Sequence, residues 1–105
     1  MKTELTFEES QKLIELGISK EYTTPIRTIE RRYWGFRFTD LLYILPKEPL
    51  ADYCLQITNW RNDIWYVGYT MQDEDPLIMY NCGELIDGLY KLVIWCIEHG
   101  YIETE

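Results

Sequence analysis

The C-terminal third of the chain carries an apolar helical pattern that constrains the fold more than any other feature. Large apolar side chains recur at helical spacing over residues 82 to 99 and fill an arc of about 200° around the helix. The members of this arc are Leu85, Ile86, Leu89, Tyr90, Leu92, Val93, Ile94, Cys96 and Ile97. Such an arc is wide for a surface helix. We therefore expect the helix to pack against a sheet on one side and against another helix on the other.

Local signals predict both ends of this helix. Asn81 and Glu84 have the spacing of a capping box, in which two side chains satisfy free amides of the first turn. The helix is therefore predicted to begin at Cys82. Gly100 follows His99 and suits the left-handed conformation that closes many helices.

Two segments rich in aromatic and β-branched residues, 53 to 60 and 64 to 71, predict an antiparallel hairpin. Pairing Ile57 with Val67 leaves a three-residue loop, 61 to 63, and places the apolar rows of both strands on one face. A slip of one residue would lose this burial, so we predict the first register. Within the loop, Asn62 or Asp63 is expected to take a left-handed backbone conformation.

Shorter elements are predicted elsewhere. Thr6 and Glu9 form a capping box for a helix that Gly17 closes. The elements with weaker patterns are a short strand over residues 33 to 38, a helix from Asp40 to Leu45 capped by Thr39 and stopped by Pro46, and an edge strand within residues 77 to 80.

Together these elements predict a small α+β fold in which residues 1 to 105 form a single domain. Its antiparallel hairpin or three-stranded sheet packs against the long C-terminal helix and the shorter N-terminal helices. A length of 105 residues suits one domain with its own core.

The net charge of −8 is distributed unevenly. Residues 23 to 39 carry four arginines against Glu30, whereas residues 40 to 105 carry three basic against twelve acidic groups. A strongly acidic surface repels phosphate backbones and anionic membranes, so we expect neither nucleic acid nor membrane as a partner. The N-terminus lacks a signal-peptide pattern and the three cysteines lack paired spacing, which favours reduced thiols and a cytoplasmic location.

The few nucleophilic and metal-binding residues do not form a catalytic pattern. His99 is the only histidine, and Cys96, three residues before it, lies within the apolar arc, so an inert buried thiol is expected. Cys54, Cys82, Cys96 and His99 lack the paired spacing of a zinc site. We therefore expect no cofactor, no metal site and no enzymatic activity.

The arginine-rich segment has two interpretations. Its arginines are interleaved with aromatic residues, a mixture that can stack on bases and pair with phosphates. Alternatively, the arginines neutralise the acidic remainder of the same chain, and the net charge favours this second interpretation. The arginines concerned are Arg27, Arg31, Arg32 and Arg37, of which Arg31, Arg32 and Arg37 are retained as candidate interaction residues.

Several aromatic residues are expected at the surface. Trp95 lies among polar residues on the C-terminal helix, and Gly88 beside it is expected to leave a notch for a partner side chain. The alternative is that the arginine-rich segment folds over Trp95. A second candidate patch lies on the hairpin face opposite the core and consists of Trp60, Ile64 and Tyr66.

These features predict a non-enzymatic interaction module that docks a protein partner or a second copy of itself through exposed aromatic residues. The alternative is an acidic mimic of nucleic acid that occupies a DNA-binding protein, because residues 40 to 105 are strongly acidic. A small enzyme is the least favoured class.

Three segments resemble small uncharacterised proteins of gut anaerobic bacteria and their phages. The segments are the helix Leu85–Ile102, the stretch Phe38-Thr-Asp-Leu-Leu-Tyr-Ile-Leu-Pro46 and the strand Trp65-Tyr-Val-Gly-Tyr69. The resemblance covers the C-terminal two-thirds of the chain. It implies an accessory protein of a phage or mobile element and supplies no site residues.

Overall fold

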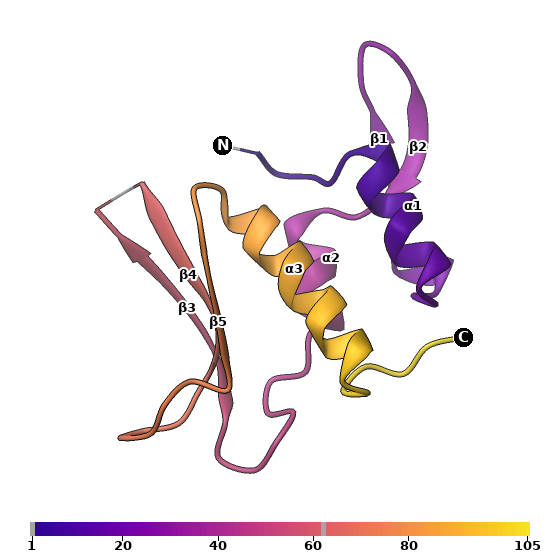
Figure 1. Ribbon diagram of the computed structural model, residues 1–105. Helices are drawn as coiled ribbons and strands as arrows, with labels where there is room; N and C mark the ends of the chain where they lie inside the picture. Colours follow the sequence, from indigo (N-terminus) through magenta and orange to yellow (C-terminus); the bar gives the residue numbers. More distant parts are fainter. Residues whose placement is uncertain (1, 62) are drawn as a thin grey trace.

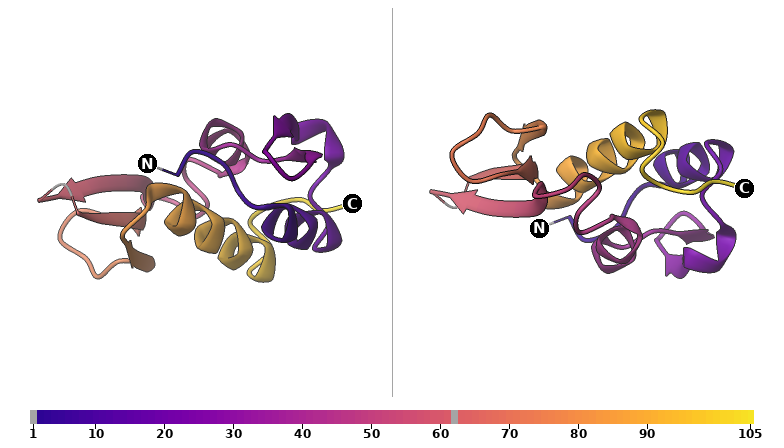
Figure 2. Two further views of the ribbon diagram at one scale, coloured as in Figure 1. Left: turned by 90° about the horizontal axis from the view of Figure 1, so that it is seen from above. Right: turned by 90° about the horizontal axis from the view of Figure 1, so that it is seen from below.

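Helix α3 (Leu85–Glu98) lies in the middle of the molecule, with a three-stranded sheet on one side and the N-terminal elements on the other (Figures 1 and 2). The computed structural model describes residues 2–61 and 63–105. Six of the helix residues are buried, and the helix packs against α2 (Phe38–Ile44) as well as against the sheet. The predicted α+β class and the two-sided burial of this helix are confirmed.

The sheet consists of β3 (Cys54–Trp60), β4 (Ile64–Thr70) and β5 (Ile78–Cys82), all antiparallel, with β4 in the centre. Ile57 lies opposite Val67, as predicted, so side-chain burial did set the register. Arg61 carries a left-handed backbone in the hairpin loop, with φ of 56°. Asn62, one of the two positions predicted for it, lies outside the described residues.

The predicted start of the C-terminal helix is wrong by three residues. Asn81 and Cys82 belong to β5, where they pair with β4, so they are not available for a capping box. Glu84 occupies the N-cap position without a side-chain capping bond. The helix ends at Glu98, and Gly100 has the expected positive φ of 76°.

The N-terminal helix α1 (Phe7–Glu15) begins with the predicted capping box, in which Thr6 accepts from the Glu9 amide and Glu9 accepts from the Thr6 amide. After the short 3₁₀ helix η1 (Lys20–Tyr22), β1 (Thr24–Arg27) and β2 (Arg32–Gly35) form a second hairpin. The predicted strand over residues 33 to 38 is thus shorter than expected, and β1 was not predicted at all.

Helix α2 begins two residues earlier than predicted, at Phe38, and Thr39 is not its cap. The Arg37 amide instead donates to the Asp40 carboxylate over 2.9 Å. The segment just before the helix is also fixed, because the Leu5 amide donates to the Phe36 carbonyl and the Phe38 amide donates to the Thr3 carbonyl. This pairing with the N-terminal segment ends β2 and sets the start of the helix.

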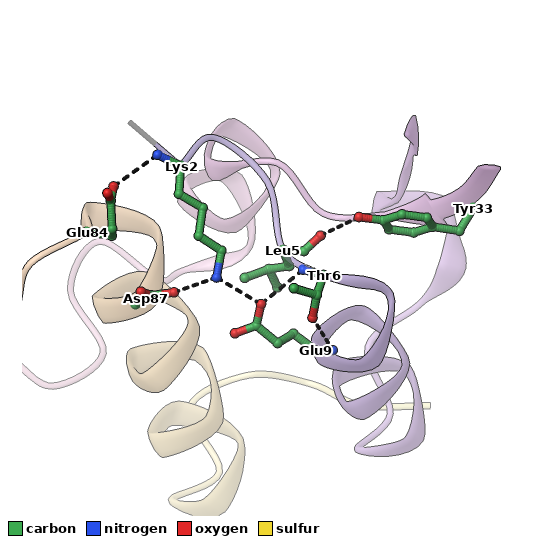
Figure 3. Close-up of polar contacts among 7 residues, drawn as sticks. All are labelled: Lys2, Leu5, Thr6, Glu9, Tyr33, Glu84 and Asp87. Carbon is green, nitrogen blue, oxygen red and sulfur yellow. Dashed lines mark hydrogen bonds and ion pairs between the residues drawn. The ribbon is translucent and has the colours of Figure 1, made fainter. Parts of the chain in front are cut away.

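A polar network ties the N-terminal segment to both α1 and α3 (Figure 3). The Lys2 ammonium contacts the Asp87 carboxylate at 2.8 Å and the Glu9 carboxylate at 3.1 Å, and the Lys2 amide donates to Glu84. Burial lowers the pKa of Lys2, but the hydrogen bonds to Asp87 and Glu9 outweigh it, so the pKa is raised overall. The network places carboxylates at the first turn of α3, where the helix dipole favours them.

Candidate interaction surfaces

The outer face of the sheet, opposite α3, carries an aromatic cluster at the end of the β3–β4 hairpin. Because side chains alternate along a strand, the register that buries Val67 directs Trp60, Ile64 and Tyr66 to the outer face. Trp60 lies directly opposite Ile64 and is 52% exposed, and Ile64 is 41% exposed. We call Trp60, Arg61, Ile64 and Tyr66 the hairpin-tip cluster.

The geometry of the hairpin-tip cluster is that of a small aromatic platform with a cation beside it. The Trp60 and Tyr66 rings lie 6.4 Å apart between centroids, at 53° to each other. The Arg61 guanidinium carbon lies 5.7 Å from the Trp60 ring centroid. The four side chains line a shallow hollow of about 230 Å³. Sequence reasoning missed Arg61, although its position next to Trp60 in a tight loop would have been a usable signal.

Trp95 is half-buried, which confirms that it is partly exposed in the single chain. Its ring is stacked with His99 at 4.3 Å and with Tyr101 at 5.5 Å between centroids, and Tyr69 of β4 lies 6.3 Å away. The alternative that the arginine-rich segment covers Trp95 is wrong, because these neighbours belong to the sheet and to the chain end. The Trp95 ring therefore packs mainly against residues of its own chain.

The predicted notch at Gly88 does not exist. Gly88 is buried against the sheet, and an added Cβ atom would lie 2.6 Å from Cys82 Sγ and 3.0 Å from Val67 Cγ2. The missing side chain allows α3 to approach the sheet closely, and no space is left for a partner. The prediction failed because the polar arc of the helix faces the sheet along part of its length.

The arginines of residues 23 to 39 do not balance the acidic residues by direct contact. None of Arg27, Arg31, Arg32 and Arg37 forms an ion pair with any residue that the structure describes, and all four are exposed. The Arg31 guanidinium instead lies 3.9 Å from the centroid of the Phe7 ring. Trp34, one of the aromatic residues interleaved with these arginines, is 61% exposed on the β1–β2 hairpin.

The thiols and the histidine do not form a reactive pair. Cys96 is buried and its Sγ atom lies 3.6 Å from the Tyr69 hydroxyl, and burial raises the pKa of the thiol. His99 is stacked on Trp95, and Cys82 lies in β5 with its pKa also raised by burial. Across residues 2–61 and 63–105, no three or more His, Cys, Asp or Glu side chains gather in a way that suits a metal ion.

No protein-family model, curated protein or solved structure matches this chain. Among the described helices, none has both the length and the apolar character needed to cross a membrane. Two of the surfaces described above expose a tryptophan by more than half, the hairpin-tip cluster through Trp60 and the outer face of the β1–β2 hairpin through Trp34.

Proposed function

We propose that the protein is a non-enzymatic interaction module that docks a protein partner through the hairpin-tip cluster. The observation that carries the proposal is the exposure of Trp60 opposite Ile64 at the end of an open sheet face. Tryptophan, tyrosine and arginine are the residue types that dominate interface hot spots, and all three are present in this cluster.

The shape of the cluster favours a protein over a small molecule. Its hollow of about 230 Å³ is smaller than the usual range of ligand pockets, which is about 300 to 1,000 Å³. Polar side chains continue the same face away from the tip, where Gln56 interacts with Thr58 and Thr70. An apolar centre bordered by polar groups is the usual arrangement of a protein interface.

The setting of this interaction is also part of the proposal. All three cysteines are free, which suits a reducing compartment, and we place the protein in the cytoplasm. The resemblance of its C-terminal two-thirds to small proteins of gut anaerobes and their phages supports an accessory role in a phage or mobile element.

Site-specific photo-crosslinking in the native host tests this proposal. A benzophenone side chain at position 60 is expected to form a covalent adduct with one discrete protein. The matched control carries the same group at Tyr43, which is 78% exposed on α2 and lies outside the cluster. The adduct should form from position 60 and be absent from position 43. Equal adducts from both positions, or none from position 60, would contradict the proposal.

A further inference from the structure

The outer face of the β1–β2 hairpin combines two cations with two apolar rings. Arg32 and Trp34 lie on one face of β2 because side chains alternate, and their cross-strand partners are Arg27 and Pro25. The Tyr33 side chain lies on the opposite face, where its hydroxyl donates to the Leu5 carbonyl. Gly35 lies on that face too, and a Cβ atom added there would meet Ser10 of α1. We call Pro25, Arg27, Arg32 and Trp34 the arginine face. All four are exposed, and together with Ile26 and Tyr33 they line a hollow of about 470 Å³.

The charges of the arginine face have no ion-pair partners among the residues that the structure describes. Arg27 lies directly opposite Arg32, and like charges in this arrangement repel each other. Neither forms an ion pair with the residues that the structure describes. An anionic group placed between the two guanidinium groups would relieve this repulsion and pair with both.

A complementary surface exists at the other end of the molecule. The loop between β4 and β5 contains Asp73, Glu74 and Asp75, which are exposed and form no ion pair in the described part of the chain. We call these three residues the acidic loop; Pro76, also exposed, follows them. Figures 1 and 2 show the loop and the β1–β2 hairpin at opposite ends of a molecule that measures 46 × 35 × 16 Å, so the two surfaces do not meet within one chain.

We propose that the arginine face binds the acidic loop of a second copy of the protein, so that copies associate head to tail. The charges are complementary, and the exposed Pro76 ring beside the carboxylates offers an apolar surface to Trp34. Because the net charge of −8 makes copies repel one another in most orientations, the arginine face is the part of each copy that favours approach by another. The contact joins two different surfaces, so repeating it builds a closed ring where the rotation between copies closes and an open chain where it does not.

Single-stranded nucleic acid is the competing occupant, because arginines beside an exposed tryptophan also suit phosphates and bases. The second copy is favoured for two reasons. The strongly acidic remainder of the chain repels a long polyanion, whereas a short acidic loop brings only a few charges. The loop is also present at the same concentration as the face that would bind it.

A charge-swap experiment tests the proposal. The face variant is R27E/R32E and the loop variant is E74R/D75R; Asp73 is kept because its φ of 62° makes substitution there strained. Sedimentation equilibrium at about 0.01 M salt, where the screening length is about 30 Å, should show the average mass of the native protein rising above 12.7 kDa with concentration. The mass should return to that of the monomer at about 1 M salt, where screening acts over about 3 Å.

Each variant alone should remain monomeric at low salt, because its face and its loop carry the same sign of charge. An equimolar mixture should regain association, since each contact between the two variants again joins opposite charges. A native protein that stays monomeric at low salt, variants that associate as the native protein does, or a mixture that stays monomeric would each overturn the proposal. Tighter binding of a labelled ten-nucleotide oligothymidylate than of a second copy, lost in R27E/R32E, would assign the face to nucleic acid instead.

Two controls keep the outcome interpretable. Circular dichroism should show both variants folded, because the substituted side chains are exposed and have no ion-pair partners among the described residues. A Trp60→Ser variant should associate as the native protein does, because Trp60 is not part of either surface. A failure of head-to-tail association would therefore not contradict the hairpin-tip proposal. A failure of the crosslinking test at position 60 would likewise not contradict head-to-tail association.

Discussion

Replacing Gly68 with alanine is expected to lower the free energy of unfolding by about 3 kcal/mol or more, because the new methyl group would collide with backbone. Gly68 is buried in the central strand β4, where it lies directly opposite Met79 of the antiparallel strand β5. An added Cβ atom would lie 2.9 Å from Met79 Cα and closer still to the Ile78 carbonyl oxygen. Backbone atoms cannot rotate away as the end of a side chain can, so β5 must shift or detach.

Chemical denaturation followed by circular dichroism measures this effect. The matched control is Gly83→Ala, because the nearest atom to an added Cβ there is the Asp63 carbonyl oxygen at 4.0 Å. The control should change the unfolding free energy by less than about 0.5 kcal/mol. A Gly68→Ala variant as stable as the control would show that β5 is not packed on β4 as described.

Replacing Leu89 with alanine is expected to cost about 2 to 5 kcal/mol, because it removes a fully buried side chain and leaves a cavity. Leu89 has no exposed surface and belongs to the core between the sheet and α2. Domains of this size are stable by only about 5 to 15 kcal/mol, so this loss is a large fraction of the total.

The matched control for this variant is Leu50→Ala, the same chemical change at a side chain that is 44% exposed. Its cost should stay below about 1 kcal/mol, because much of the side chain already contacts water. A loss under about 0.5 kcal/mol for Leu89→Ala in the same denaturant titration would mean that the buried face of α3 is misassigned.

The elements with strong periodic patterns were predictable from the sequence, and those decided by tertiary pairing were not. The hairpin register followed from burial of Val67, since a slip of one residue moves every side chain to the other face. The start of α3 did not follow, because pairing of Asn81 and Cys82 with β4 replaced a capping box that local spacing alone favours. Tertiary hydrogen bonds outweighed the local signal.

A strand overlapping β2 was predicted, but β1 and its pairing with β2 were not, for a similar reason. Pro25 and the facing arginines Arg27 and Arg32 give its strands no clear apolar alternation. The hairpin is held instead by one inward face, where Ile26 is buried and the Tyr33 hydroxyl donates to the Leu5 carbonyl over 2.7 Å. Such support depends on the N-terminal segment, whose position a local pattern does not reveal.

The candidate surfaces were predicted unequally well. The alternation of a strand places Trp60, Ile64 and Tyr66 on the outer face as soon as the register is known. A helical wheel, in contrast, shows which residues share an arc but not which neighbouring element covers it. Trp95 and Gly88 therefore appeared equally open, although the sheet closes over Gly88 and leaves Trp95 half-buried.

The affinity of the partner captured from position 60 tests the central claim most directly. In isothermal titration calorimetry, Trp60→Ala is expected to weaken binding about 30-fold, which corresponds to the 2 kcal/mol of an interface hot spot, whereas Tyr43→Ala should leave it unchanged. The native affinity should change little between low and high salt, because the cluster is mainly apolar. Binding by Trp60→Ala within about threefold of the native protein, or a steep loss of affinity with salt as expected of an acidic mimic of nucleic acid, would contradict the claim.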